Sequence, residues 1–162
     1  MTYRQFIFSV SLLLLLGGSA VAPTSAAPTI VSANAIVQPA RISPGGKGVL
    51  RIIVHVATGF HINANKPNDP DLIPTVIKAS GPACVTFGAV AYAKPSSIAV
   101  AYEKMPMLVY QGQSVIVVPF SIAKSTSAGN VALKANMSYQ GCNAVSCYPP
   151  NSAAISAYAV VK

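Results

Sequence analysis

Two cysteines near the C-terminal end of the chain are close enough in sequence to pair. Cys142 and Cys147 stand five positions apart in the segment Tyr-Gln-Gly-Cys-Asn-Ala-Val-Ser-Cys-Tyr-Pro-Pro. In thiol–disulfide exchange a thiolate attacks a disulfide sulfur and forms a mixed disulfide, which a second nearby thiol can resolve. Cys142 and Cys147 therefore supply the two nearby thiols that exchange requires.

The same pair also has a purely structural interpretation. In an oxidising compartment the two cysteines are expected to form a disulfide, which could simply staple a small hairpin loop. Closing a loop this short restricts the unfolded chain little and stabilises the fold by only about 2 kcal/mol. The pair is therefore poorly placed for a structural disulfide. Gly141 frees the backbone at the turn and Tyr148-Pro149-Pro150 stiffens the other side, so we expect the second sulfur near the surface.

The elements that must position these cysteines are β-strands. The clearest strand is predicted at residues 47–56, where Leu50, Ile52 and Val54 alternate with polar neighbours, Ile53 excepted. Similar alternation predicts core strands at 114–123 and 130–139, and the second of these ends just before Cys142.

Weaker strand patterns occur at 75–79, 83–91, 107–110 and 153–161, and no amphipathic helix is evident. Pro119 predicts an edge strand or a bulge in its segment. Residues 28–39 are interpreted as an apolar lead-in, and residues 59–74, rich in Asn, Pro and Asp, as a long structured loop. About eight strands without helical crossovers predict an all-β fold, an immunoglobulin-like antiparallel β-sandwich.

Two blocks of sequence resemble a known family. They are Gly-Phe-His-Ile-Asn-Ala-Asn-Lys-Pro at 59–67, followed by Leu-Ile-Pro-Thr at 72–75, and Tyr-Gln-Gly-Cys at 139–142 with Cys-Tyr-Pro-Pro at 147–150. Their order and spacing resemble the N-terminal periplasmic domain of the thiol–disulfide interchange protein DsbD, over roughly residues 30–162.

The resemblance implies a periplasmic carrier of reducing equivalents that needs no cofactor. It implies that Cys147 forms mixed disulfides with partners and that Cys142 resolves them. The implied donor is a membrane thiol–disulfide transporter or a thioredoxin-like protein, and the implied acceptors are periplasmic thioredoxin-fold proteins, including those of cytochrome maturation. Since the sequence ends where the membrane domain of an interchange protein would begin, we expect the donor to be another polypeptide.

The family also shields its cysteines with a cap loop that precedes a strand. By position, this loop corresponds to residues 102–106, although no aromatic cap is evident within it. The residues expected to form the cap and to contact partners are Tyr102, Glu103, Lys104, Met105, Pro106, Tyr139 and Tyr148.

The N-terminal segment predicts export. Arg4 precedes an apolar run of about eleven residues, Phe6 to Leu16, which is shorter than the roughly 20 residues of a membrane span. Small residues follow, so residues 1–26 are interpreted as a signal peptide with cleavage near Ala26. The expected domain then covers residues 27–162, and we expect it not to span the membrane after cleavage.

The charge is strongly basic, at +8 with only three acidic residues. A nucleic-acid-binding surface is expected to carry a basic stripe interleaved with aromatic residues. Here the lysines are scattered singly, among them those at positions 47, 66, 78, 94, 104, 124 and 134. We therefore expect no nucleic-acid partner.

Other chemistries find less support in the residues. His55 falls on a polar strand face and His61 lies among Asn and Pro, so both are interpreted as structural, and no metal site is expected. Met105 and Met107 offer soft ligands, which keeps copper handling open as an alternative. A non-redox interaction module with a structural disulfide is a further alternative. Cys84 is interpreted as a spare, inert thiol that shares a strand face with Thr86.

Overall fold

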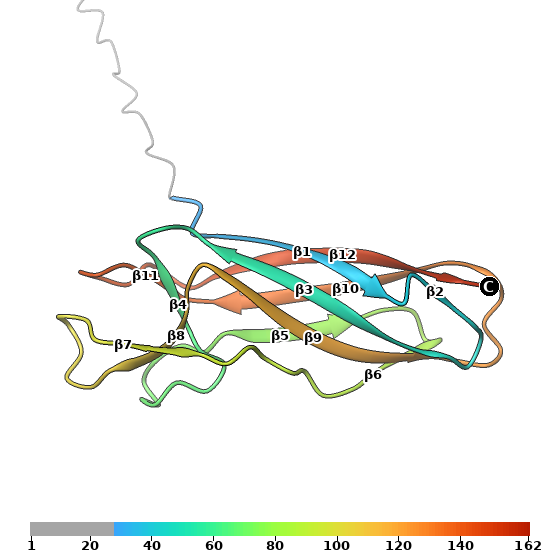
Figure 1. Ribbon diagram of the computed structural model, residues 1–162, viewed down its shortest axis with the longest axis horizontal. Helices are drawn as coiled ribbons and strands as arrows, with labels where there is room; N and C mark the ends of the chain where they lie inside the picture. The colour runs from blue at the N-terminus through green and yellow to red at the C-terminus, as the bar shows by residue number, and fades with distance from the viewer. Residues whose placement is uncertain (1–27) are drawn as a thin grey trace, which may run out of the picture.

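Two β-sheets face each other in the computed structural model, which describes residues 28–162, and a third small sheet closes one end (Figure 1). The first sheet contains, in order, β1 (Val31–Gln38), β3 (Lys47–Val56), β9 (Gln113–Ile122) and β6 (Val85–Phe87). All of its neighbouring strands are antiparallel. The predicted signal peptide, residues 1–26, lies outside the described residues.

The second sheet contains, in order, β2 (Arg41–Ile42), β12 (Asn151–Val161), β10 (Gly129–Tyr139) and β5 (Val76–Ser80). Its long pairings are antiparallel, and only the short contact of β2 with β12 is parallel. The two sheets enclose a single hydrophobic core.

The alternation seen in the sequence becomes the burial pattern of the core. On β3, β9 and β10 every second residue is buried and faces the opposite sheet, as predicted. The buried residues on these strands are Leu50, Ile52, Val54, Val56, Ile116, Val118, Phe120, Ile122, Val131, Leu133, Ala135, Met137 and Tyr139. The predicted immunoglobulin-like β-sandwich is thereby confirmed.

The third sheet, called the end sheet here, contains β11 (Gly141–Cys142), β4 (His61–Asn63), β8 (Met107–Tyr110) and β7 (Ser96–Ile98), in that order. Figure 1 shows it at the end of the sandwich opposite the C-terminus. It brings the cysteine segment beside two segments that are distant in sequence, because β4 pairs with both β11 and β8.

The segment predicted as a long structured loop, residues 59–74, contains a short strand, β4, which the prediction missed. All three residues of β4 are buried, including the polar His61 and Asn63. A strand covered on both faces shows no alternation of apolar and polar residues. The buried Asn63 is instead held by hydrogen bonds. Its side-chain Nδ2 donates to the Ile73 carbonyl at 2.9 Å, and its backbone carbonyl accepts from Thr75 Oγ1.

Two further segments differ from the prediction. The lead-in at residues 28–39 contains β1, whose pattern is weak because two of its four inward residues are alanine and because Ile36 points outward, 45% exposed. The edge-strand interpretation of Pro119 was wrong, since β9 pairs with β3 on one side and β6 on the other. Pro119 faces the chain just past the end of β6, where the Gly88 amide donates to the Pro119 carbonyl and Ala91 bonds to Val117. Because β6 has already ended there, the N–H that proline lacks has no partner in a strand.

Candidate redox site

A tight hairpin holds the two cysteines opposite each other. The Asn143 amide donates to the Ser146 carbonyl at 2.9 Å, and the Tyr148 amide donates to the Gly141 carbonyl at 2.8 Å. Cys142 and Cys147 therefore occupy the non-hydrogen-bonded position between these bonds, where Cα atoms of facing strands come closest. Their Cα atoms are 4.0 Å apart, and the sulfurs form a disulfide of 2.04 Å.

The turn of this hairpin is organised by one side chain. Asn143 Oδ1 accepts hydrogen bonds from the amides of Val145 at 2.9 Å and Ser146 at 2.8 Å. This is the local side-chain-to-backbone bonding that makes asparagine a turn former. It leaves the Val145 side chain 78% exposed at the tip.

The two sulfurs lie in different environments. Cys142 is fully buried in β11, directly opposite His61 of β4. Cys147, by contrast, is exposed on the returning arm of the hairpin, as predicted for the second cysteine. Cys147 therefore lies on the surface side of the hairpin, and Cys142 is enclosed by the core.

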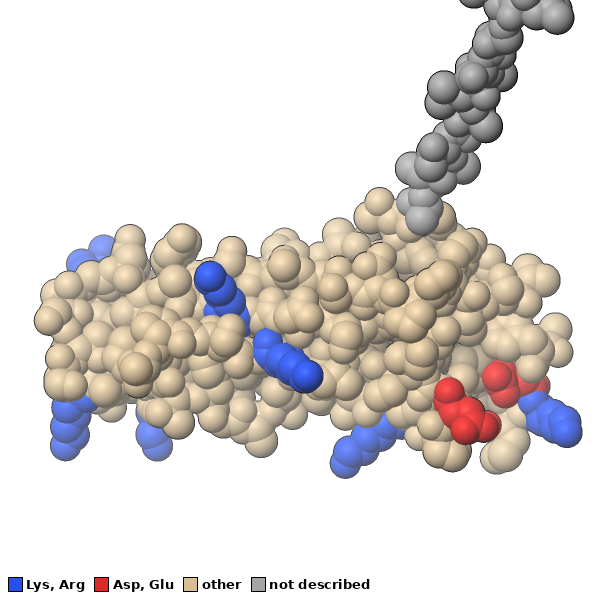
Figure 2. All heavy atoms as spheres, turned by 180° about the vertical axis from the view of Figure 1, so that it is seen from behind, with Lys and Arg blue, Asp and Glu red and all other residues tan. Residues whose placement is uncertain are grey.

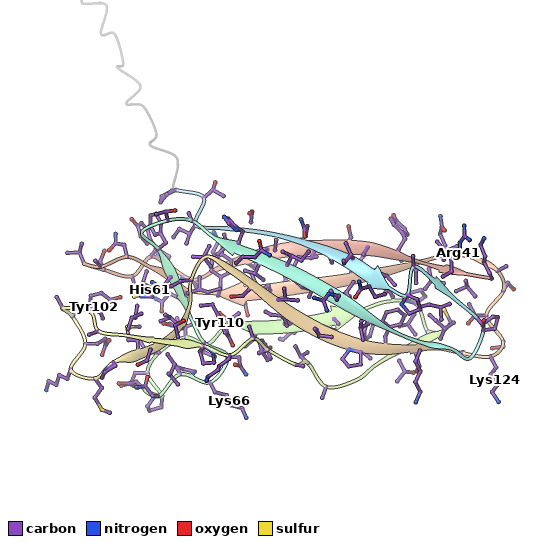
Figure 3. All side chains as sticks on the ribbon, in the orientation of Figure 1. Arg41, His61, Lys66, Tyr102, Tyr110 and Lys124 are labelled. Atoms are coloured by element: carbon purple, nitrogen blue, oxygen red, sulfur yellow. A yellow bond between two sulfur atoms is a disulfide. The ribbon has the colours of Figure 1, made fainter. Side chains whose placement is uncertain are left out.

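An aromatic residue of the predicted cap loop covers the exposed sulfur, contrary to the expectation that this segment lacks an aromatic cap. The Tyr102 hydroxyl oxygen lies 3.8 Å from Cys147 Sγ. The hydroxyl also donates to the Asn143 carbonyl at 3.2 Å and lies 3.2 Å from His61 Nε2. Figure 3 shows Tyr102 and His61 together at the end of the molecule that carries β11.

The rest of the cap loop is more open. Glu103 is half-buried, while Lys104, Met105 and Pro106 are exposed. The Pro106 carbonyl accepts a hydrogen bond of 2.6 Å from Asn68 Nδ2, which ties the loop to the segment that follows β4. Between the two segments lies a cavity of about 330 Å³, lined by residues that include Asp69, Leu72 and Met105.

The two tyrosines outside the cap loop that were expected to contact partners differ in exposure. Tyr148 is half-buried beside the hairpin, with its ring centroid 5.9 Å from that of Phe60. Tyr139 is only 5% exposed at the end of β10, so it packs beneath the hairpin and offers little surface to a partner. Burial raises the pKa of the Tyr139 hydroxyl.

His61 is the site residue that the sequence interpretation missed. It was interpreted as structural, yet it is 3% exposed, faces Cys142 across the β4–β11 pair and lies within hydrogen-bond distance of Tyr102. Burial lowers the pKa of its imidazole. The resemblance could have pointed to it, because the His-Ile-Asn segment is part of the block that accompanies the cysteines.

Other candidate residues are not brought to the hairpin. His55 is exposed on β3. Cys84 lies just before β6 and packs half-buried against the core, so the alternation that grouped it with exposed Thr86 does not extend to it. Within residues 28–162, no three His, Cys, Asp or Glu side chains are grouped to hold a metal ion.

Charge is distributed unevenly over the molecule. Figure 2 shows the acidic residues gathered at one end, the end of the cap loop, while Lys and Arg are spread along the whole length. The chain's three carboxylates are Asp69, Asp71 and Glu103. Across the described range, no helix has the length and apolar character to cross a bilayer.

Comparison with known proteins agrees with this geometry. Residues 27–158 match the family model "Thiol:disulfide interchange protein DsbD, N-terminal". Among solved structures, the N-terminal periplasmic domain of ScsB from Proteus mirabilis is similar, with a TM-score of 0.50 and 17% identity over 78% of this chain. The similar region covers 44% of that ScsB chain, so this chain corresponds to under half of it.

A second similar structure is the DsbD N-terminal domain of Neisseria meningitidis in its reduced form. Its TM-score is 0.43 and its identity 21%, over 68% of this chain and 77% of that one. No curated protein sequence matches the chain. Since the family model covers most of the sequence, and since the disulfide lies in the block that resembled the family, the chain belongs to the family of DsbD N-terminal thiol–disulfide interchange domains.

Proposed function

We propose that this domain is a periplasmic carrier of reducing equivalents in which Cys147 exchanges with partners and Cys142 resolves the mixed disulfide. The observation that carries the proposal is the difference in burial, with Cys142 fully buried and Cys147 exposed. A structural staple has no need of an accessible sulfur, whereas exchange by in-line attack requires one.

The reducing half-reaction begins when a donor thiolate attacks Cys147 Sγ. The bond between the two sulfurs breaks, a mixed disulfide forms with the donor, and Cys142 leaves as a thiolate that takes up a proton. The donor's second thiolate then attacks the donor sulfur of the mixed disulfide and releases Cys147. Two electrons have reached the pair, and the donor dithiol has become a disulfide.

The second half-reaction runs in the opposite direction. The Cys147 thiolate attacks the disulfide of an acceptor, which forms a mixed disulfide and releases one acceptor thiolate. Cys142 then attacks Cys147 Sγ, which restores the intramolecular disulfide and releases the second acceptor thiolate. The distance of 4.0 Å between the Cα atoms keeps the resolving thiol within reach of Cys147 at this step.

The partners proposed are a membrane thiol–disulfide transporter or a thioredoxin-like protein as donor and periplasmic thioredoxin-fold proteins as acceptors. The cap loop at residues 102–106 lies over Cys147, so partner access requires Tyr102 to move aside. In the unpartnered protein the same residue would shield the sulfur from unrelated thiols.

Mixed-disulfide trapping tests the assignment of the two cysteines. Reduced Cys142→Ser and Cys147→Ser variants, both in a Cys84→Ser background, are mixed with an oxidised thioredoxin-fold protein and quenched with acid. We expect the Cys142→Ser variant to accumulate the mixed disulfide, because nothing resolves it, and the Cys147→Ser variant to react at least about tenfold more slowly. Equal trapping, or trapping through Cys142 alone, would overturn the proposal.

A further inference from the structure

A chain of three polar groups lies beside the exposed sulfur. His61 Nε2 is 3.2 Å from the Tyr102 hydroxyl, which is 3.2 Å from the Asn143 carbonyl and 3.8 Å from Cys147 Sγ. The three residues come from β4, the cap loop and the hairpin turn. The Tyr102 hydroxyl therefore links the buried histidine to the accessible cysteine.

Counting protons fixes the direction of these hydrogen bonds in the oxidised protein. A carbonyl oxygen can only accept, so the single hydroxyl proton of Tyr102 is donated to Asn143. The bond between Tyr102 and His61 must then use a proton on His61 Nε2, which makes the imidazole the donor. A disulfide sulfur carries no proton, and at 3.8 Å Cys147 Sγ is in contact with the hydroxyl without being its hydrogen-bond partner.

Reduction changes what the hydroxyl can bind. A Cys147 thiolate is a charged acceptor, and hydrogen bonds to ionised groups are about twice as strong as those between neutral groups. A rotation of the Tyr102 O–H bond away from the Asn143 carbonyl would aim its proton at Cys147 Sγ, with no movement of the phenol ring. The bond from His61 Nε2–H to the hydroxyl oxygen would persist and polarise the hydroxyl.

We propose that Tyr102 is a redox-dependent hydrogen-bond switch, donating to the Asn143 carbonyl when the cysteines are oxidised and to the Cys147 thiolate when they are reduced, with His61 as the residue that positions and polarises it. The proposal rests on the function proposed above and deepens it. No electron passes through Tyr102 or His61, and the Cys147 proton is lost to solvent. The switch stabilises Cys147 as attacking thiolate and as leaving group.

The surroundings of His61 suit this role. The imidazole is 3% exposed, and burial holds its pKa below the ordinary value, so it is a neutral N–H donor in neutral solution. Among the described residues, the groups facing it include Cys142 across the strand pair, which does not titrate while it is in the disulfide, and the Tyr102 hydroxyl from the cap loop. Burial, followed by the charge of Glu103, raises the pKa of Tyr102, so the hydroxyl keeps its proton.

The pKa of Cys147 tests this proposal. It is measured in a parent protein that carries Cys84→Ser and Cys142→Ser, from the pH dependence of the rate of alkylation by iodoacetamide, which mass spectrometry monitors. We expect Tyr102→Phe to raise this pKa by about one unit, which lowers the thiolate fraction at pH 7 about tenfold. His61→Leu should raise it as well. His61→Gln should restore most of the wild-type value, because the glutamine amide can place an N–H where Nε2–H lies.

A merely structural role for the two residues gives a different result. If Tyr102 and His61 only hold the cap loop closed, Tyr102→Phe changes the limiting alkylation rate at high pH and leaves the pKa of Cys147 within about 0.2 units of the parent, which would overturn the switch. The ¹⁵N spectrum of the oxidised protein supplies a second readout, since a proton on His61 Nδ1 in place of Nε2 would also overturn it.

Failure of the switch and failure of the proposed function are distinguishable. If the pKa of Cys147 does not respond to Tyr102→Phe while the Cys142→Ser variant still traps a thioredoxin-fold protein, only the switch is wrong. If Cys147 does not trap such a protein at all, the carrier function itself is wrong.

Discussion

At the scale of single residues, the site depends on an unequal pair of cysteines and on the buried histidine beside them. Cys142 is enclosed while Cys147 is exposed under one tyrosine, so burial alone distinguishes the two sulfurs. His61 is the only buried histidine of the two in the chain, since His55 is exposed. Its burial has a consequence for stability that can be measured.

The free energy of unfolding should fall as the pH falls below about 6.5, because burial lowers the pKa of His61 from its ordinary value of 6.5. In that range His61 takes up a proton more readily in the unfolded chain than in the folded protein, which lowers the free energy of unfolding. At higher pH the imidazole is neutral in both states, and its contribution to the pH dependence vanishes. Thermal unfolding between pH 5 and pH 7.5 measures the change.

His61→Gln should remove this slope, and His55→Gln, at an exposed position, should leave it unchanged. A slope that survives His61→Gln would show that another group is responsible.

At the scale of elements, the end sheet positions the cysteines against the rest of the domain. Gly141 of β11 is packed directly on Ile30, which precedes β1. A Cβ at position 141 would lie 2.6 Å from Ile30 Cδ1 and 2.9 Å from Ile30 Cγ2. The glycine is therefore required by the close approach of these two segments.

Gly141→Ala should destabilise the protein by about 1–3 kcal/mol, the usual cost of overpacking a buried position. Because residue 141 immediately precedes Cys142, the shift should also displace the hairpin. Urea unfolding of the oxidised protein measures the loss. Gly88→Ala is the matched control, since its Cβ would meet nothing closer than 3.5 Å. Equal effects of the two substitutions would refute this account of Gly141.

The strands that are buried on one face only could be predicted from the sequence. The strand at 47–56 could be read from alternation because one face of β3 meets the core and the other meets solvent. β4 could not, because its polar residues His61 and Asn63 are buried by specific hydrogen bonds. The cysteine pair was evident from its spacing, whereas the contact of Tyr102 with Cys147 joins residues 45 positions apart that no local pattern connects.

At the scale of the whole molecule, one end is built differently from the other. The cap loop and the hairpin project from the end that carries the end sheet (Figure 1). Each of these two segments carries an exposed apolar side chain. These side chains are Met105, 69% exposed, and Val145, 78% exposed. The carboxylates gather at the same end (Figure 2), so this end differs from the basic remainder in charge as well.

We propose that partners dock at this end of the molecule. Replacing both exposed apolar side chains, Met105→Ser with Val145→Ser, should then slow mixed-disulfide formation with a thioredoxin-fold protein about five- to tenfold, because apolar contact area at this docking end is lost. Reduction by dithiothreitol, which needs no docking surface, should change much less. Tyr158→Ser is the control, at a residue 64% exposed near the C-terminus. If the control slows the reaction as much as the double substitution does, the docking end is not where we place it.

The reduction potential of the Cys142–Cys147 pair tests the central claim most directly. Purified Cys84→Ser protein is equilibrated in graded glutathione or dithiothreitol buffers, and free thiols are counted by mass. The account predicts a value between about −180 and −280 mV, among those of proteins that exchange disulfides. A value well below about −300 mV, typical of structural disulfides, would contradict it and make the hairpin disulfide a staple.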